Sequence, residues 1–590
     1  MTVSSAETSA ANLTVNAKRV WLFALALSFA IALVIISPFF WKGNASGHDF
    51  SFHVASWMDA AAQWRDGILF PRWTDAANHG FGEPRFIFYP PISWMFAAAL
   101  GLVLPWIAVP AVFIVLTQTV AGLCAFVLGR RLFPPRGALV CAVCYAANPY
   151  ALLIVYMRSD FAEQLALAFF PLLFLAAAEV AGPLDAPLRS ARRSIVFLAI
   201  TFAAVWLTNA PAGVVTTYSL ATLFAWTSVT KQSWRPLLHG AAALALGFGV
   251  AAFYLVPAAY EQSWVNISLA LASGLQPSQN FLYSIIADAE HNAFNRIASH
   301  AAVLMMVLTA LFAALSFPRD RSTAGPLTKS FWGALVALSL MAAFLMMRVS
   351  NIFWLTLPKL RFVQFPWRWM SILAIPFACF ISAAIVHKRV RGYRATSIIA
   401  ALLAILACTA AYMVRRTWWD SEDVPVLLEA LQNDQGFEGV DEYDPQGDDH
   451  SLLPEKSERA TVTRATAEAE AETKKGTEAA PASEADVAIK SWTAEKKEVR
   501  ITAREPAVLK LRLLDYPAWR VKVNGSEVIP EQTGETAQIT VPLPAGSSDV
   551  VARFIRTPDR TIGAAISAAS VLIALLLFTT RRPAAKSPLA

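Results

Sequence analysis

The sequence predicts a mainly α-helical, multi-pass membrane protein with a small β-sandwich near its C-terminus. The chain of 590 residues is 56% hydrophobic and only 15% charged, which lies outside the range of soluble domains. Its apolar segments are about 16 to 23 residues long, enough to cross a hydrocarbon core of roughly 30 Å as helices. From about residue 486 onward, short segments with alternating apolar residues and Pro or Gly turns replace them, a pattern typical of strands.

The first apolar segment, Val20 to Phe40, follows a polar stretch that ends in Lys18-Arg19. A signal peptide would be shorter and would precede a small-residue cleavage site, so we expect a retained span with residues 1–19 in the cytoplasm. Clusters of Arg and Lys then mark the cytoplasmic connections and predict about 12 crossings, with both chain ends inside. The further spans are expected near residues 106–128, 138–157, 161–180, 194–209, 211–229, 238–257, 300–317, 331–347, 368–386, 396–413 and 562–580.

Residues 91–105 form an apolar segment with two alternative assignments. The segment could be a short span or a re-entrant helix. Only a re-entrant helix keeps the basic clusters on one side of the membrane.

The net charge of +7 resides mostly in the inner basic clusters. Such clusters suit the anionic inner leaflet of a lipid bilayer. No basic patch on a soluble module is visible, so we expect no nucleic-acid partner. The five cysteines fall within apolar spans, where we expect them to pack rather than to react.

The outer loop of residues 41–90 contains an ionisable cluster directly after the first span, in Gly47-His48-Asp49-Phe50-Ser51-Phe52-His53. A charge at a membrane boundary usually has a partner, a water-filled cleft or a role in function. Asp49 and His53 are four residues apart, so one helical face would present both. We therefore regard Asp49 as the leading candidate for a catalytic carboxylate, with a solvated loop residue as the alternative.

Three arginines of this outer loop, Arg65, Arg72 and Arg85, run against the general excess of positive charge on the inner side. A guanidinium group suits a phosphate well. We expect these side chains to bind a phosphate-bearing substrate. Contacts with ordinary anionic headgroups or with loop carboxylates are the alternative.

A second acidic position is predicted at the junction of two apolar segments, in Tyr156-Met157-Arg158-Ser159-Asp160-Phe161-Ala162-Glu163. Asp160 and Glu163 are three residues apart, so a helix that starts here would direct both carboxylates the same way. We expect them to face Asp49 and either to hold a divalent cation through oxygen ligands or to orient a substrate. Acidic residues also favour the N-terminus of a helix, so capping is the alternative role.

Two further regions concentrate polar groups on the outer face. Glu261 stands at a helix end before an outer loop that contains His291, and it either lines a site or serves the helix end. The segment Leu357 to Trp369 interleaves aromatic residues with Arg361 and Arg368. That composition suits a polyisoprenoid phosphate, with the apolar tail below and the anionic head above, and it is also typical of an interfacial anchor.

The composition changes beyond about residue 415. Residues 416–485 are first acidic and then rich in Ala, Glu, Thr and Lys, which predicts a linker, with a helical stalk as the alternative. Residues 486–558 are expected to form an outer β-sandwich, more an acceptor-binding or packing module than a second enzyme, and residues 559–590 return the chain to the inside. The strands are expected at Val487 to Trp492, Glu498 to Ala503, Ala507 to Leu514, Trp519 to Val523, Ala537 to Val541 and Asp549 to Ile555.

Several motifs occur together along residues 20–415. They are Gly47-His48-Asp49 with Phe52-His53, Gly67-x-x-Phe70-Pro71-x-Trp73, Gly80-Phe81-Gly82 with Phe88-Tyr89-Pro90-Pro91, Arg158-x-x-x-x-Glu163 and Gln364-Phe365-Pro366-Trp367-Arg368. In combination they resemble the bacterial membrane family labelled 6-pyruvoyl-tetrahydropterin synthase-related, a neighbour of the YfhO-type proteins. The zinc-binding histidine pattern of the soluble pterin synthase is not evident, so the label implies no pterin chemistry.

That family is usually grouped with the GT-C superfamily of membrane glycosyltransferases, which includes oligosaccharyltransferases and protein mannosyltransferases. The resemblance implies a GT-C-like helical bundle in the bacterial inner (cytoplasmic) membrane, with a site that faces the periplasm. It also implies transfer of a sugar from a polyprenyl-phosphate-linked donor to an acceptor of the cell envelope. Asp49 takes the position of the general base, and Asp160 or Glu163 matches the second acidic position.

The predicted site combines the residue patterns with this resemblance. Its catalytic residues are Asp49, His53, Asp160 and Glu163, and the three carboxylates are candidate metal ligands. No cofactor is assigned, because the Asp-x-Asp pattern of some GT-C enzymes is interrupted by Ser51, which leaves dependence on Mg²⁺ or Mn²⁺ open. The expected substrate-binding residues are His48, Arg65, Arg72, Arg85, Tyr89, Arg158, Glu261, Gln364 and Arg368.

Two other classes of function fit the same residues. A transporter or flippase of lipid-linked sugars would need polar residues at mid-membrane depth and a pair of interrupted helices. Charged residues are nearly absent from the middle of the predicted spans, which favours chemistry at the outer surface over transport. A non-catalytic membrane scaffold is the third class, and the sequence does not decide against it.

Overall fold

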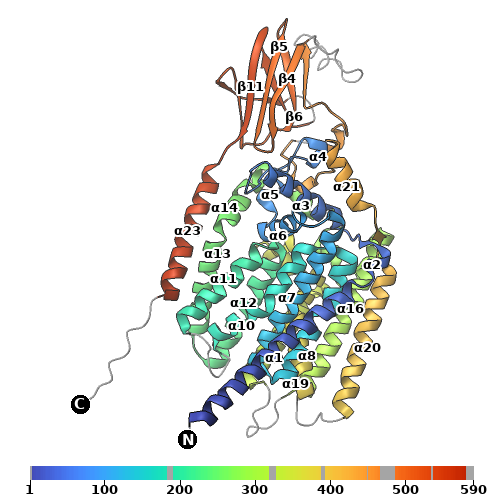
Figure 1. Cartoon of the computed structure of the whole chain (residues 1–590), viewed down its shortest axis with the longest axis vertical. Helices are drawn as coiled ribbons and strands as arrows, with labels where there is room; N and C mark the ends of the chain where they lie inside the picture. The colour runs from blue at the N-terminus through green and yellow to red at the C-terminus, as the bar shows by residue number, and fades with distance from the viewer. Residues whose placement is uncertain are drawn as a thin grey trace, which may run out of the picture.

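Long apolar helices form a bundle, and a domain of β-strands stands on one end of it (Figure 1). The computed structural model describes residues 3–182, 190–317, 327–386, 393–447, 449–464, 485–532 and 536–579. The protein is mainly α-helical with a C-terminal sheet domain, as the sequence predicts. The chain runs from α1 (Val3–Ile36) through the bundle to α20 (Tyr393–Arg416), builds the sheet domain, and returns in α23 (Pro558–Thr579).

Eight helices of the described chain are long and apolar enough to cross a membrane, which makes this a multi-pass membrane protein. Two bent pairs would raise the number to 10. In the first, α13 (Arg235–Val250) is followed by Ala252–Trp264, which begins with α14 (Ala252–Tyr260). In the second, α17 (Lys329–Leu345) is followed by Arg348–Thr356, which ends with α18 (Asn351–Thr356). The predicted count of about 12 crossings is not confirmed. α11 (Ala191–Trp206) has only 16 residues, and Ser and Thr side chains lower the hydropathy of α12 (Ala210–Lys231). The eight segments are Lys18–Lys42, Trp106–Leu132, Pro135–Arg158, Phe161–Ala181, Ala289–Leu315, Pro366–Val386, Tyr393–Arg416 and Pro558–Thr579.

The segment of residues 91–105 contains a helix of 11 residues, α6 (Pro91–Gly101). Such a helix is roughly 16 Å long, about half of the hydrocarbon core, so α6 is too short to cross it. It packs against α3 (Phe50–Arg65) and α7 (Val109–Leu132) on the side of the bundle that carries the sheet domain (Figure 1). This placement agrees with the re-entrant alternative.

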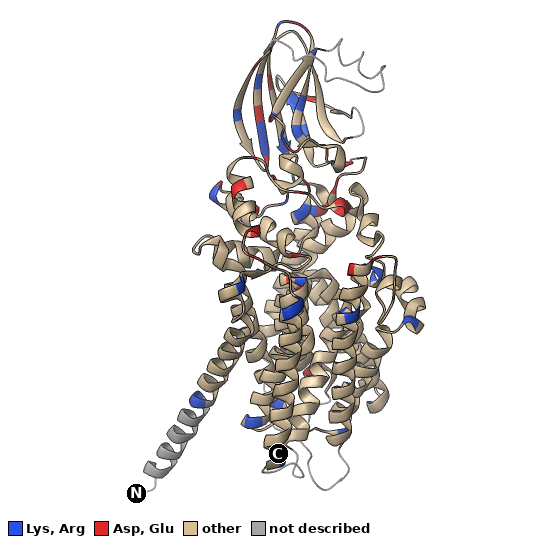
Figure 2. Ribbon diagram, turned by 90° about the vertical axis from the view of Figure 1, so that its right-hand side faces the viewer, with Lys and Arg blue, Asp and Glu red and all other residues tan. Residues whose placement is uncertain are grey.

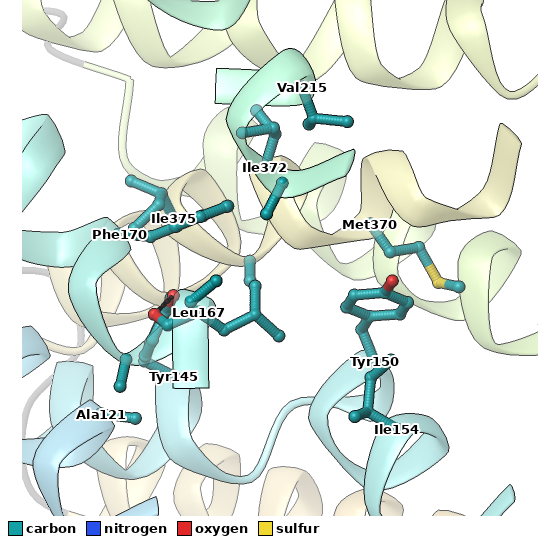
Figure 3. Packing of buried hydrophobic residues seen from close by; sticks show 14 of the residues in the cluster. Ala121, Tyr145, Tyr150, Ile154, Leu167, Phe170, Val215, Met370, Ile372 and Ile375 are labelled. Carbon is teal, nitrogen blue, oxygen red and sulfur yellow. Dashed lines mark hydrogen bonds between the residues drawn. The ribbon is translucent and has the colours of Figure 1, made fainter. Parts of the chain in front are cut away.

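The centre of the bundle is held by α10 (Phe161–Ala181) and α19 (Met370–Val386), whose residues are almost all buried. Figure 3 shows Leu167 and Phe170 of α10 packed near Ile375 of α19 and Tyr145 of α8 (Pro135–Ala146). The Tyr145 hydroxyl donates to the Leu167 carbonyl oxygen at 2.7 Å, so this buried polar group is satisfied. By contrast, α1, α20 and α23 leave most of their residues exposed, as expected of helices that face lipid.

The sheet domain consists of two antiparallel sheets that share one apolar core. Its strands are β3 (Ala460–Arg464), β4 (Ala485–Thr493), β5 (Lys496–Ala503), β6 (Ala507–Leu514), β7 (Trp519–Val523), β8 (Ser526–Val528), β9 (Glu531–Gln532), β10 (Gln538–Leu543) and β11 (Gly546–Phe554). One sheet has the order β3-β6-β10-β9 and the other β4-β5-β11-β7-β8. Every predicted strand is present. β3 lies within the region predicted as a linker, and residues 465–484 of that region lie outside the described residues.

Aromatic and ionic contacts join the sheet domain to the outer loop. The fully buried Trp73 packs against Tyr516 and Trp519 of the sheet domain. The ammonium group of Lys497, which is buried in β5, forms an ion pair with Asp75. The outer loop is therefore held from above by the sheet domain and from below by the bundle.

Asp59 of α3 lies next to this junction, and its ionisation makes the free energy of unfolding depend on pH. Its carboxylate accepts hydrogen bonds from the Asp75 N–H at 3.1 Å and from Gln63 Nε2 at 3.2 Å. Burial, and then the charge of Asp75, raise the pKa of Asp59 to about 8. The folded protein keeps a proton that the unfolded chain releases above about pH 4. This group therefore makes folding less favourable as the pH rises from about 4 to about 8.

We expect Asp59→Asn to remove that pH-dependent cost. Relative to wild type, the stability of the variant should rise between about pH 4 and about pH 8, by on the order of a few kcal/mol, and then level off. Melting temperatures in detergent at several pH values measure this difference. Asp66→Asn, at an exposed residue just after α3, is the control. A stability difference that does not change with pH would contradict the buried, protonated Asp59.

Candidate active site

The segment before α3 is held against the turn between η2 (Ile154–Arg158) and α10. Ser159, which ends η2, has a left-handed backbone with φ 54°. Its hydroxyl donates to the Ala45 carbonyl oxygen at 2.7 Å and accepts from the Gly47 N–H at 3.0 Å. The Asp49 N–H donates to the Arg158 carbonyl oxygen at 3.0 Å. These contacts bring Asp49 to the second acidic position, although the two segments are far apart in the sequence.

Gly47 permits this close approach, because a Cβ there would lie 2.6 Å from the Arg158 carbonyl carbon and 2.6 Å from the Met157 carbonyl oxygen. We expect Gly47→Ala to push the two segments apart and to cost about 1–3 kcal/mol of stability, as overpacking does. The melting temperature of the purified variant measures the loss. Ser51→Ala changes an exposed residue of the same region and should leave the melting temperature unchanged. An equally stable Gly47→Ala protein would show that the approach is not tight.

Two arginines join carboxylates from different parts of the chain. Arg158 pairs with Asp49 through Nη2. Arg368, in η7 (Pro366–Trp369), lies 3.1 Å from Asp160 and 3.1 Å from Glu163. Asp160 also caps α10, because its Oδ1 accepts from the Glu163 N–H at 2.8 Å. Asp160 is therefore both a helix cap and a member of this group of charged residues. We call the group the charged cluster; it consists of Asp49, Arg158, Asp160, Glu163 and Arg368.

His53 lies between the acidic positions. Its Nε2 is 3.6 Å from Oδ1 of Asp160, and its Nδ1 shares a hydrogen bond of 2.5 Å with the Tyr89 hydroxyl. Burial by itself would raise the pKa of Asp160. The contact with His53 and the charge of Arg368 outweigh burial and hold this pKa below its ordinary value, so Asp160 is a stable anion in the folded protein.

Asp49 is the most accessible carboxylate of the charged cluster. Its side chain is 28% exposed, against 6% for Asp160 and 2% for Glu163. Glu163 accepts a hydrogen bond from the Tyr150 hydroxyl. It lies behind Asp49 and Asp160, in contact with Arg368. Asp49 is thus the carboxylate of this cluster that can meet a bound molecule.

Four members of the charged cluster, Asp49, Arg158, Asp160 and Arg368, line a cavity of about 690 Å³. The ring of His48 packs at its wall, 4.8 Å from the ring of Phe294, and burial, followed by the charge of Arg158, lowers the pKa of His48. The turn at residues 209–211, before and in the first turn of α12, also lines the cavity. The structure brings together here the predicted site residues His48, Asp49, His53, Tyr89, Arg158, Asp160, Gln364 and Arg368.

Arg85 and Glu261, which the sequence predicts as substrate-binding residues, lie outside the cavity. Arg85 is buried and pairs with Glu83 at 2.5 Å. Glu261 is completely buried and accepts two hydrogen bonds of 2.7 Å from Arg560 in α23. A buried charge keeps its partner because an unpaired one is costly, so neither side chain is free for a phosphate or a sugar.

Arg65 and Arg72 are not brought to the cavity either. Arg65 is exposed in the last turn of α3. Arg72 is half-buried over the ring of Phe70, at 5.2 Å, and lines a smaller pocket beside α5 (Arg85–Phe88). Glu163 lies behind the cavity wall, in contact with Arg368.

Two parts of the chain supply cavity residues that sequence reasoning missed. Asp288 caps α16 (Ala289–Leu315), and both Asp288 and Glu290 line the cavity. Glu442 and Tyr443 of η8 (Asp441–Tyr443) also line it, although the sequence placed them in an acidic linker. Burial, together with neighbouring carboxylates such as Glu83, raises the pKa of Glu442 to about 7. In the sequence, the aromatic Tyr443 inside this acidic stretch was the available sign of a packed segment.

Asp49, His53 and Asp160 form a candidate metal site. Each offers one ligand atom, and the three atoms lie within 4.8 Å of one another. This set contains His53 in place of the predicted Glu163. Two carboxylates and an imidazole suit Mn²⁺ or Zn²⁺ better than Mg²⁺, which prefers oxygen ligands. Each carboxylate already has an arginine partner, which offsets part of the charge that a cation would neutralise.

The charged cluster lies at one end of the bundle. Arg158 ends the helical segment that starts at Pro135, whereas the basic pair Arg130 and Arg131 precedes that start, in the last turn of α7. Figure 2 shows Lys and Arg near the lower end of the bundle and acidic residues gathered below the sheet domain. The cavity and the sheet domain therefore share the side opposite to this basic connection.

Comparison with known proteins finds no family and a weak likeness to solved structures. No family model and no curated protein match the sequence. The apo structure of an oligosaccharyltransferase from Archaeoglobus fulgidus is similar over 69% of this chain and 56% of that chain, at 14% identity and a TM-score of 0.39. Its complex with Zn and sulfate is similar over 66% and 53%, at 15% identity and a TM-score of 0.33. The chain spans about half the length of these structures, and TM-scores this low do not establish a common fold.

Proposed function

We propose that this protein is a membrane glycosyltransferase of the bacterial inner membrane. It transfers a sugar from a polyprenyl-phosphate-linked donor to an acceptor of the cell envelope, on the periplasmic side, where the sheet domain lies. The observation that carries the proposal is that Asp49, Asp160 and their two arginines converge in one large cavity. A lipid phosphate from the membrane and an acceptor from water can meet at this boundary.

Asp49 acts as the general base. A base must come within hydrogen-bond distance of the proton that it removes, and Asp49 is the most exposed carboxylate of the cluster. Arg158 fixes its orientation, and His53 stands behind it. As Asp49 takes the proton of the acceptor hydroxyl, that oxygen bonds to the anomeric carbon and the bond from this carbon to the phosphate oxygen breaks. The lipid phosphate leaves with the electron pair, and the single displacement inverts the anomeric centre.

Arg158 is the best-placed ligand for the leaving phosphate. It lines the cavity, and among the described residues its buried Nε has no hydrogen-bond partner. Its guanidinium group stacks on Phe365 at 4.8 Å and on Trp367 at 5.6 Å, which fixes its plane. A preorganised guanidinium offsets charge as it develops on phosphate oxygens. Arg368, already paired with two carboxylates, supports the cluster from behind.

A divalent cation is compatible with this proposal at Asp49, His53 and Asp160, whose ligand atoms converge. When bound, it would supply positive charge beside the leaving phosphate. Transfer that survives prolonged treatment with EDTA would assign this role to the arginines alone.

One observation favours transport of lipid-linked sugars as a second candidate. The pairs α13/α14 and α17/α18 are bent by 76° and 89°, and interrupted helices are typical of transporters. Neither break lines the cavity that holds the charged cluster. A transporter would bind its substrate at such breaks, so glycosyl transfer ranks first.

Purified protein incubated with labelled polyprenyl-phosphate sugars and envelope acceptors tests the proposal. Product formed by the wild type and lost in Asp49→Asn supports glycosyl transfer. Movement of labelled donor across proteoliposome membranes, without product, would support transport instead. The absence of both activities with every donor tested would favour a non-catalytic membrane scaffold.

A further inference from the structure

A second pocket lies on the flank of the protein. It has a volume of about 180 Å³ and lies between α5, α14 and the first turns of α23. α14 and α23 pack side by side below the sheet domain (Figure 1). Other residues of the α5 region, Phe88 to Pro90, line the cavity of the charged cluster, so this region separates the two. The flank pocket therefore sits at the same membrane boundary as the cavity.

The flank pocket combines an apolar floor with an excess of positive charge. Phe70, Phe86 and Phe253 contribute rings to it, and Arg72, Arg556 and Arg560 contribute guanidinium groups.

Among the described residues, only one of these guanidinium groups forms an ion pair with a carboxylate. Arg560 is paired with the buried Glu261. Within the described residues, neither Arg72 nor the exposed Arg556 forms an ion pair. Burial, and then the charge of Arg560, lower the pKa of Arg72, and Glu495 opposes this effect only in part. The two arginines therefore leave positive charge facing the pocket.

We propose that the flank pocket binds the phosphodiester headgroup of an anionic bilayer lipid. Two guanidinium groups match the oxygens of a phosphate. The outer leaflet supplies such groups at this depth, and exposed apolar residues of α23, such as Ile562 and Ile566, would lie along the acyl chains. At about 180 Å³, the flank pocket is much smaller than the cavity of about 690 Å³ that the charged cluster lines. A lipid bound here would hold α23 against α14, independently of any sugar transfer.

Native mass spectrometry of the full-length protein, released from detergent with added lipid, tests this inference. Phosphatidylglycerol should stay bound to the wild type, and zwitterionic phosphatidylcholine should be lost. Arg72→Gln and Arg556→Gln should each weaken phosphatidylglycerol binding about fivefold, the usual contribution of one basic residue at an anionic surface, and the double variant about 25-fold. Arg65→Gln, in the same outer loop but away from the pocket, is the matched control.

Each other outcome would overturn the inference. Equal retention of both lipids, or unchanged binding in both single variants, would show that the arginines do not hold a headgroup. Preferential retention of polyprenyl phosphate over phosphatidylglycerol would assign the pocket to a different lipid. Displacement of bound phosphatidylglycerol by millimolar inorganic phosphate would show a free-anion site. Each single variant alters a side chain that is half-buried (Arg72) or exposed (Arg556), so we expect both proteins to fold. Their melting temperatures verify this.

Discussion

Asp49→Asn should lower the rate constant of sugar transfer about 100- to 10,000-fold, the range that a positioned general base contributes. Asparagine has nearly the same shape as aspartate, and its amide oxygen can still accept a hydrogen bond from Arg158. It cannot take a proton from the acceptor hydroxyl. Since the lost interaction belongs to the transition state, kcat should fall while KM changes little. Initial rates with a labelled donor at several acceptor concentrations measure both constants.

Asp66→Asn is the matched control for this prediction. It makes the same chemical change in the same outer loop, at an exposed residue just after α3, so its rates should equal those of the wild type. The melting temperature of Asp49→Asn verifies that the loop is still folded. Full transfer activity in Asp49→Asn would remove Asp49 from the mechanism, and a change confined to KM would reduce it to a binding residue.

The fold class could be predicted from the sequence because the patterns behind it are local. An apolar stretch of sufficient length becomes a helix wherever it sits in a bilayer. The alternation of apolar residues in Val487 to Trp492 likewise gives a strand, β4, without knowledge of its partners. The number of crossings depends on more than local hydropathy: α11 is short, and the two bent pairs divide their apolar residues between two directions.

The part of the site that could be predicted consists of ionisable residues next to membrane spans. Asp49, Arg158 and Arg368 each stand at the boundary of an apolar segment, where an unpaired charge is costly, and they meet in one cavity. Arg85 shows that a charge near a membrane boundary does not always belong to the site. Its partner Glu83 is only two residues away, but whether the two side chains meet depends on the backbone at the start of α5. Glu442 reaches the cavity through tertiary packing, which the neighbouring Tyr443 does not specify by itself.

The largest loss of stability is expected at the buried cluster that joins the bundle, the sheet domain and α23. Glu261 begins η3 (Glu261–Trp264) and accepts hydrogen bonds from Nε and Nη2 of Arg560, both at 2.7 Å. It also accepts one from the Tyr516 hydroxyl of the sheet domain at 2.6 Å. Asp559, a second buried carboxylate, interacts with Glu261. Arg560 is thus the cation that lets Glu261 stay buried.

We expect Arg560→Met to destabilise the protein by about 3–5 kcal/mol, because it leaves Glu261 buried without a cation. Unfolding in lipid-free detergent with increasing SDS, followed by tryptophan fluorescence, measures the loss. Arg556→Met alters an exposed arginine four residues earlier and should stay within about 0.5 kcal/mol of the wild type. Adding Glu261→Met to Arg560→Met should restore most of the stability, since it removes the unpaired charge. If the double variant were no more stable than Arg560→Met, packing rather than the unpaired carboxylate would explain the loss.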